Sequence, residues 1–75
     1  NKMTNFTQAQ ALSEIRAYAK NLCMTFKVQN ATINGKQAYM LTNRKTGVVL
    51  AKNFTLWTAY ENMQSGYFDK VAQNI

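Results

Sequence analysis

The dipeptide Asn34-Gly35 constrains the fold of this chain more than any other feature. It lies between two segments in which apolar and polar residues alternate, a pattern typical of strands. Asn and Gly are also the residues that most readily adopt the positive φ angles of a type I′ turn. The two segments are therefore predicted to form an antiparallel hairpin, with strands over residues 25–33 and 36–43.

A two-residue turn sets a register, and the register assigns each side chain to one face of the hairpin. The expected pairs are Ile33 with Lys36, Ala31 with Ala38, Gln29 with Met40, and Val28 with Leu41. The face with the larger apolar side chains is predicted to be the core face, and it carries Phe26, Val28, Tyr39 and Leu41. The opposite, outer face is expected to carry Lys27, Gln29, Ile33, Lys36, Ala38, Met40 and Thr42.

A second turn is predicted at residues 44–47, where Gly47 occupies the position that favours a left-handed conformation. A third strand should follow over residues 48–52. We expect Val48 and Leu50 on its core face, and Val49 and Ala51 on its outer face. The longer loop specifies this register less strictly than the two-residue turn specifies the first.

Two amphipathic helices flank the three strands. Residues 8–22 follow Thr7, which forms the pattern of a capping box with Gln10. Residues 56–65 follow Thr55 and stop at Gly66, and residues 67–75 can add a last helical turn or two. The predicted fold class is α+β: one domain over residues 1–75, in the order α-β-β-β-α, with a three-stranded antiparallel sheet and the helices packed on one of its faces.

The positive charge of the chain is concentrated in the predicted sheet. The net charge is +6, and residues 24–54 contain five of the nine basic residues and no acidic residue. A surface of this kind attracts polyanions such as nucleic acid or an acidic protein. A solvated face that keeps a small protein in solution is the alternative interpretation.

Several classes of function are disfavoured by composition. The chain has no histidine and only three dispersed acidic residues, and it lacks a glycine-rich phosphate loop. We therefore expect no enzymatic activity, no cofactor, no metal site and no small-molecule substrate. The single cysteine, Cys23, is expected to be a small buried apolar residue. The longest apolar run, residues 48–51, is far too short to cross a membrane. A cytoplasmic location is predicted.

The outer face of the sheet and its turns form the predicted binding face, which contains Lys27, Gln29, Ile33, Lys36, Met40, Thr42, Arg44, Lys45, Val49 and Lys52. Apolar side chains among cations favour a protein interface, either with a partner or with a second copy of the chain. The alternative is a nucleic-acid-binding surface, because an antiparallel ribbon can enter the major groove of DNA.

The order helix, three strands, helix is similar to that of double-stranded RNA-binding domains, although the lysine cluster that begins their last helix is replaced here by Thr55-Leu56-Trp57-Thr58. The segment from Gly35 to Met63 is similar in layout to the DNA-binding arms of phage and transposon integrases. Residues 39–69, YMLTNRKTGVVLAKNFTLWTAYENMQSGYFD, resemble small phage- or prophage-encoded proteins with no assigned role. The last resemblance implies a bacterial or phage origin and, with it, accessory work on host or phage machinery.

Overall fold

The computed structural model describes residues 7–74 of the chain. A helix, α1 (Gln8–Asn21), leads into three strands, and two helices complete the fold. The strands are β1 (Met24–Ile33), β2 (Lys36–Asn43) and β3 (Val49–Phe54), and the last helices are α2 (Leu56–Ser65) and α3 (Tyr67–Ala72). The three strands pair antiparallel in the order β1-β2-β3, so β2 is central and β1 and β3 are the edges.

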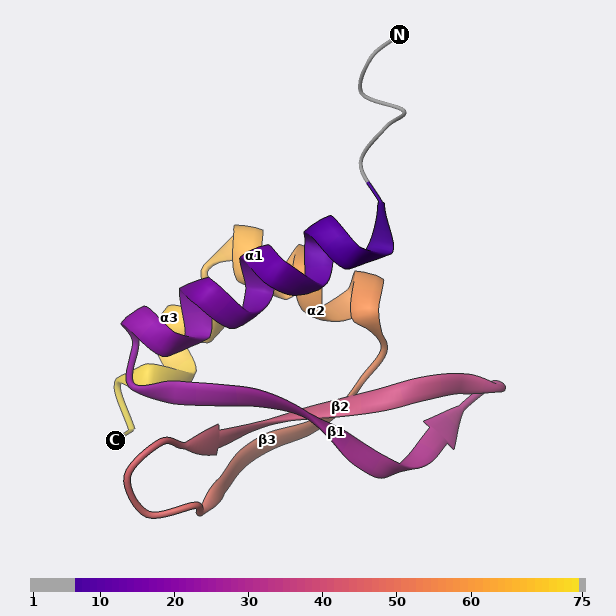
Figure 1. Cartoon of the computed structure of the whole chain (residues 1–75). Coiled ribbons are helices and arrows are strands. Elements are labelled where there is room, and N and C mark those ends of the chain that lie inside the picture. The colour runs from indigo at the N-terminus through magenta and orange to yellow at the C-terminus, as the bar shows by residue number, and fades with distance from the viewer. Residues whose placement is uncertain (1–6, 75) are drawn as a thin grey trace, which may run out of the picture.

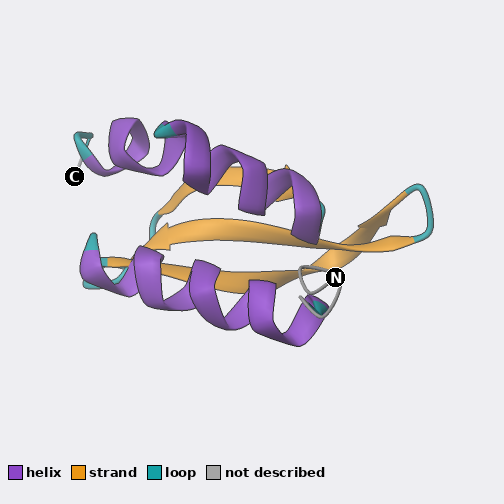
Figure 2. Cartoon of the chain, turned by 90° about the horizontal axis from the view of Figure 1, so that it is seen from above, coloured by secondary structure: helices purple, strands orange, loops and turns teal. Residues whose placement is uncertain are grey.

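The elements form two layers. All three helices lie on one face of the sheet (Figures 1 and 2), with α1 along the β1 side and α2 and α3 beside it. Within the described residues, no element covers the opposite face (Figure 1). This arrangement confirms the predicted α+β class and the packing of the helices on one side of the sheet. It leaves the other side open to a partner.

The helix boundaries follow the capping residues. In the capping box of α1, the Thr7 backbone N–H donates to Gln10 Oε1 at 2.8 Å, and the Gln10 N–H donates to Thr7 Oγ1 at 3.1 Å. At the start of α2, Thr55 Oγ1 accepts from the Thr58 N–H at 3.4 Å. Gly66 ends α2 in the left-handed conformation, at φ 93°. The Thr7 cap thus sets the start of α1, and Thr55 and Gly66 set the start and the end of α2.

The core lies between the helices and the sheet, and Phe68 of α3 is at its centre. Phe68 is fully buried, and its ring lies 6.2–6.4 Å from the rings of Tyr18, Phe26 and Phe54. The remaining buried apolar residues come from α1, the strands, α2 and α3. Among those with no exposed surface, the largest are Ile15, Met24 and Leu41. The last helix is therefore part of the core.

The register of β1 and β2 matches the prediction near the turn and departs from it further away. Ile33 pairs with Lys36, as expected, but Lys27 pairs with Met40, where Gln29 was predicted. An irregularity between Val28 and Thr32 gives β1 two extra residues. Because side chains alternate with a period of two, a shift of two residues changes the partners and leaves Lys27 and Met40 on the outer face. Two predictions next to the irregularity are wrong. Val28, predicted on the core face, is 51% exposed, and Ala38, predicted on the outer face, is fully buried.

The side chain of Gln37 stabilises this irregular stretch. Its Nε2 lies 2.6 Å from the carbonyl oxygen of Gln29, 2.8 Å from that of Ala38 and 3.4 Å from that of Ala31. The irregular pairing removes ladder partners from carbonyl groups of β1, and an amide with two N–H donors satisfies them. A single side chain thus replaces the missing backbone contacts.

The observed register of β3 against β2 differs from the predicted one. It starts at Val49 and runs to Phe54, and Val48 precedes it as an exposed residue where a core position was expected. Ala51 lies opposite Leu41 and packs against the core, whereas the outer face was predicted. Two irregularities in the β2–β3 ladder cause these differences, because each inserts one extra residue into β3.

Within residues 7–74, three residues other than glycine have positive φ: Cys23 (63°), Asn34 (52°) and Asn53 (71°). The value at Asn34, with 80° at Gly35, confirms the predicted hairpin turn. Cys23 occupies the left-handed position after α1, and its thiol is exposed, so the prediction of a buried residue is wrong. The backbone must reverse there to enter β1, and this reversal turns the side chain outward.

Candidate functional site

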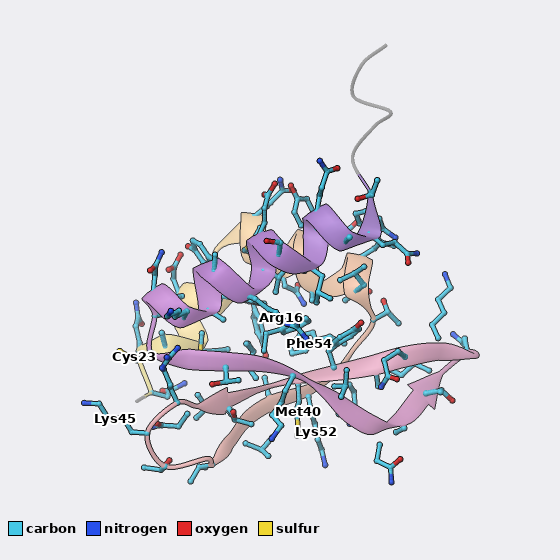
Figure 3. All side chains as sticks on the ribbon, in the orientation of Figure 1. Arg16, Cys23, Met40, Lys45, Lys52 and Phe54 are labelled. Carbon is cyan, nitrogen blue, oxygen red and sulfur yellow. The ribbon has the colours of Figure 1, made fainter. Side chains whose placement is uncertain are left out.

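The open side of the sheet has a row of three side chains at its centre. Lys27 of β1 pairs with Met40 of β2, and Met40 pairs with Lys52 of β3. Figure 3 shows Met40 and Lys52 pointing away from the helices. The two lysines are exposed and Met40 is half-buried between them. A neutral, apolar centre is thus bordered by a cation on each edge strand.

A second row lies beside the first and consists of Thr25, Thr42 and Val49. Thr42 is 5% exposed although no described helix covers this side of the sheet (Figure 1). Val49 is 48% exposed. The two rows together, Thr25, Lys27, Met40, Thr42, Val49 and Lys52, are called the outer face below.

The structure separates two of the predicted binding residues from the outer face. Ile33 and Lys36 lie at the Asn34-Gly35 turn. The 44–47 turn is at the other end of β2, roughly 25 Å away at about 3.3 Å per residue. Met40 is four residues from Lys36 along β2, roughly 13 Å at about 3.3 Å per residue, so Ile33 and Met40 do not lie side by side. The ten residues of the predicted binding face lie along the whole length of the sheet.

Gln29, another predicted binding residue, has a structural role. Its Oε1 accepts from the Asn53 backbone N–H at 2.6 Å, and its Nε2 lies 3.2 Å from Asn53 Oδ1. Asn53 is the extra residue of β3, with φ 71°. The side chain of Gln29 thus joins the two edge strands across β2 and is already engaged in hydrogen bonds.

The cations of the second turn, Arg44 and Lys45, are held in place by the backbone. Asn43 Oδ1 accepts from the N–H groups of Lys45 at 2.8 Å and Thr46 at 3.2 Å. The Arg44 N–H donates to the carbonyl oxygen of Cys23 at 3.0 Å, which fixes the turn against the α1–β1 junction. Lys45 extends away from the molecule at this end of the sheet (Figure 3).

Charge is divided between the two layers. Residues 24–54 carry five cations and no carboxylate, a net charge of +5. In the described helices, the three cations Arg16, Lys20 and Lys70 equal the three carboxylates of Glu14, Glu61 and Asp69 in number. The net positive charge of residues 7–74 therefore resides in the strands and turns.

Two of the acidic residues are used inside the helical layer. The Tyr18 hydroxyl donates to Asp69 Oδ2 at 2.7 Å, and the Tyr60 hydroxyl donates to Glu14 Oε1 at 3.4 Å. The bond to Asp69, with burial and the charge of Asp69, raises the pKa of Tyr18 above its ordinary value of 10.0. Burial, followed by the charge of Glu14 and the hydrogen bond, raises the pKa of Tyr60. Both contacts tie α1 to the other helices.

Sequence reasoning missed the contribution of α1 to the positive surface. A shallow hollow of about 450 Å³ lies between α1 and β1, and four of its lining residues are cations: Arg16, Lys20, Lys27 and Arg44. We call it the basic hollow. Arg16 and Lys20 are four residues apart, so they lie on one side of α1, and this spacing is the sequence signal that could have revealed them.

Two kinds of feature are missing from the part of the chain that the structure describes. No group of three or more His, Cys, Asp or Glu side chains within residues 7–74 is arranged to hold a metal ion. Among the same residues, no helix has both the length and the apolar character needed to cross a bilayer.

Comparisons of the chain with protein-family models, with curated proteins and with solved structures gave no match.

Proposed function

We propose that this chain is a non-enzymatic nucleic-acid-binding module that contacts the phosphate backbone with the open, positively charged side of its sheet. The observation that carries the proposal is the division of charge between the layers, with all the net charge of residues 7–74 in the strands and turns. Phosphate groups supply most of the affinity in sequence-independent binding, and they require cations that no carboxylate neutralises.

The geometry of the outer face supports this interpretation. Lys27 and Lys52 lie on opposite edge strands with Met40 between them, so the two charges flank a neutral strip. Lys45 adds an exposed cation at the adjoining turn (Figure 3). A sheet surface of this kind can lie along a groove, with its cations directed at the phosphates on either side.

The test is fluorescence anisotropy with a labelled 20-nucleotide single strand and a labelled 20-base-pair duplex over a range of salt concentrations. The log of the binding constant is plotted against the log of the salt concentration. Counterion release predicts that the slope of this plot becomes less negative by about 0.9 for each duplex phosphate contact that is lost. The double substitution Lys45→Gln with Lys52→Gln should change the slope by about 1.8. Absence of binding by the unmodified chain at low salt refutes the proposal.

The matched control places the same change of charge in the helical layer. Gln64 and Lys70 are exposed residues of α2 and α3. Gln64→Glu with Lys70→Gln changes the net charge by −2, as the sheet variant does. We expect this control to keep the salt slope of the unmodified chain, because neither residue lies on the sheet side.

An acidic protein partner is the second candidate, and the outer face gives a specific reason for it. Met40 is half-buried and Val49 is 48% exposed, which forms a small apolar centre between cations. A second copy of the chain is a poorer occupant, because two such faces would bring lysines together without a carboxylate. Light scattering should therefore show a monomer at rising concentration.

Affinity capture from a bacterial lysate with and without nuclease separates the two candidates. A partner retained after nuclease treatment, and lost on Met40→Glu, indicates a protein that binds the outer face. Captured material that is lost after nuclease treatment indicates that the chain binds nucleic acid. The phage or prophage origin and the cytoplasmic location remain predictions that are compatible with either partner.

A further inference from the structure

The basic hollow has positive charge from three separate segments of the chain. Arg16 and Lys20 come from α1, Lys27 from the edge strand β1, and Arg44 from the β2–β3 turn. The hydrogen bond from the Arg44 N–H to Cys23 at 3.0 Å brings the turn to the α1–β1 junction. The left-handed backbone of Cys23 makes that junction tight. The convergence is therefore built into the fold.

No carboxylate neutralises this cluster. Within residues 7–74, none of the four cations forms an ion pair. Glu14 is on α1 as well, but it lies on the opposite side of the buried stripe from Arg16 and Lys20, where it accepts from Tyr60 of α2. Four like charges that share a hollow without a counter-charge create a positive potential that favours an anionic ligand.

The shape of the hollow indicates the kind of anion. Its floor is formed by Met24 and Phe26, which are almost completely buried in the core, so nothing can insert deeply. The exposed hydroxyl of Thr25 lies among the cations. A shallow, open hollow with charges spread along it suits a chain of anionic groups better than one enclosed small ion. Arginine can bind a phosphate through two parallel N–H groups.

We infer that the basic hollow binds the phosphate backbone of a nucleic acid where the strand passes the β1 edge of the sheet. This inference rests on the proposed function and extends the contact surface from the outer face to α1. Lys27 lies on both surfaces and joins them. Arg16 and Lys20 then contact the phosphate backbone of the nucleic acid and help to position it, although both residues belong to a helix outside the sheet.

The experiment uses the complete chain, the same two labelled oligonucleotides, and the double substitution Arg16→Gln with Lys20→Gln. Glutamine has nearly the helix propensity of lysine and arginine, so α1 should be retained. Counterion release alone predicts affinity losses at 0.15 M salt of about 30-fold for the duplex and about 15-fold for the single strand. The Gln64→Glu, Lys70→Gln control should lose less than about twofold.

The outcomes are distinguishable. If the unmodified chain does not bind, the proposed function fails. If it binds and the Arg16/Lys20 variant matches the control, the basic hollow is not a contact site, and the function depends on the outer face alone. Displacement of the labelled strand by equal charge concentrations of polyglutamate would overturn the assignment to phosphate. A loss well above the counterion-release value, about 30-fold for the duplex or about 15-fold for the single strand, identifies the form that the hollow contacts.

Circular dichroism verifies the fold of each variant. Should the double variant unfold, Arg44→Gln in the exposed turn gives the same test, with an expected change in the duplex salt slope of about 0.9. An unchanged slope for folded Arg44→Gln would refute the inference in that case.

Discussion

Replacement of Phe68 by alanine is expected to remove most of the stability of this domain. Phe68 is fully buried, and its ring contacts the rings of Tyr18, Phe26 and Phe54 at centroid distances of 6.2–6.4 Å. Truncation of a buried phenylalanine to alanine costs about 3–5 kcal/mol, from lost transfer energy and the cavity that remains. At about 0.05–0.15 kcal/mol per residue, a 75-residue domain has roughly 4–11 kcal/mol in total.

Urea denaturation followed by circular dichroism measures the change in the free energy of unfolding. Phe68→Leu should cost less than Phe68→Ala, because leucine fills most of the space. Lys70→Ala is the matched control on the same helix, since its side chain is exposed, and we expect a change within about 0.5 kcal/mol. A loss below about 1 kcal/mol for Phe68→Ala would show that α3 does not contribute to the core, and the reasoning would be wrong.

Three other substitutions test particular features of the fold. Gln37→Glu removes the amide that donates to three carbonyl groups, so the free energy of unfolding should fall by about 0.5–1.5 kcal/mol in urea titrations. Gln37→Lys should be less harmful because it retains donors. Cys23→Gly should stabilise the domain by up to about 1 kcal/mol in the same assay, because it removes the left-handed strain at φ 63°, and a loss of stability would contradict this interpretation. The raised pKa of Tyr18 means that the folded state retains the hydroxyl proton more strongly than the unfolded state. Stability should therefore be constant below about pH 10 and fall as the pH rises through the folded pKa, and Tyr18→Phe should reduce this alkaline loss in thermal melts.

The local elements of this protein were predictable from the sequence because their signals are short-range. The Asn34-Gly35 turn, the Thr7 and Thr55 helix caps and the Gly66 stop each depend on a few adjacent residues, and all occur at the expected positions. The alternation along the hairpin likewise predicted the core positions of Phe26 and Leu41, but not the exposure of Val28 or the burial of Ala38 beside the irregular stretch. Met40 points outward as expected, and an error of two residues in the register left that assignment unchanged.

The tertiary structure decided the features that depend on irregular pairing. An extra residue in a strand is favoured by contacts with other strands, such as those of Gln37 and Gln29, and it leaves no short-range signal. For the same reason Val48 and Ala51 were assigned to the wrong positions.

The distribution of the cations in space also depended on tertiary contacts. The predicted strand over residues 36–43 already placed Lys36 and Arg44 at opposite ends of the positively charged segment. The spacing of Arg16 and Lys20 places them on one side of a helix, but it does not indicate that they face Lys27 across a shared hollow. Charge content is a property of the chain, whereas the surface on which the charges meet is determined by how the helices pack on the sheet.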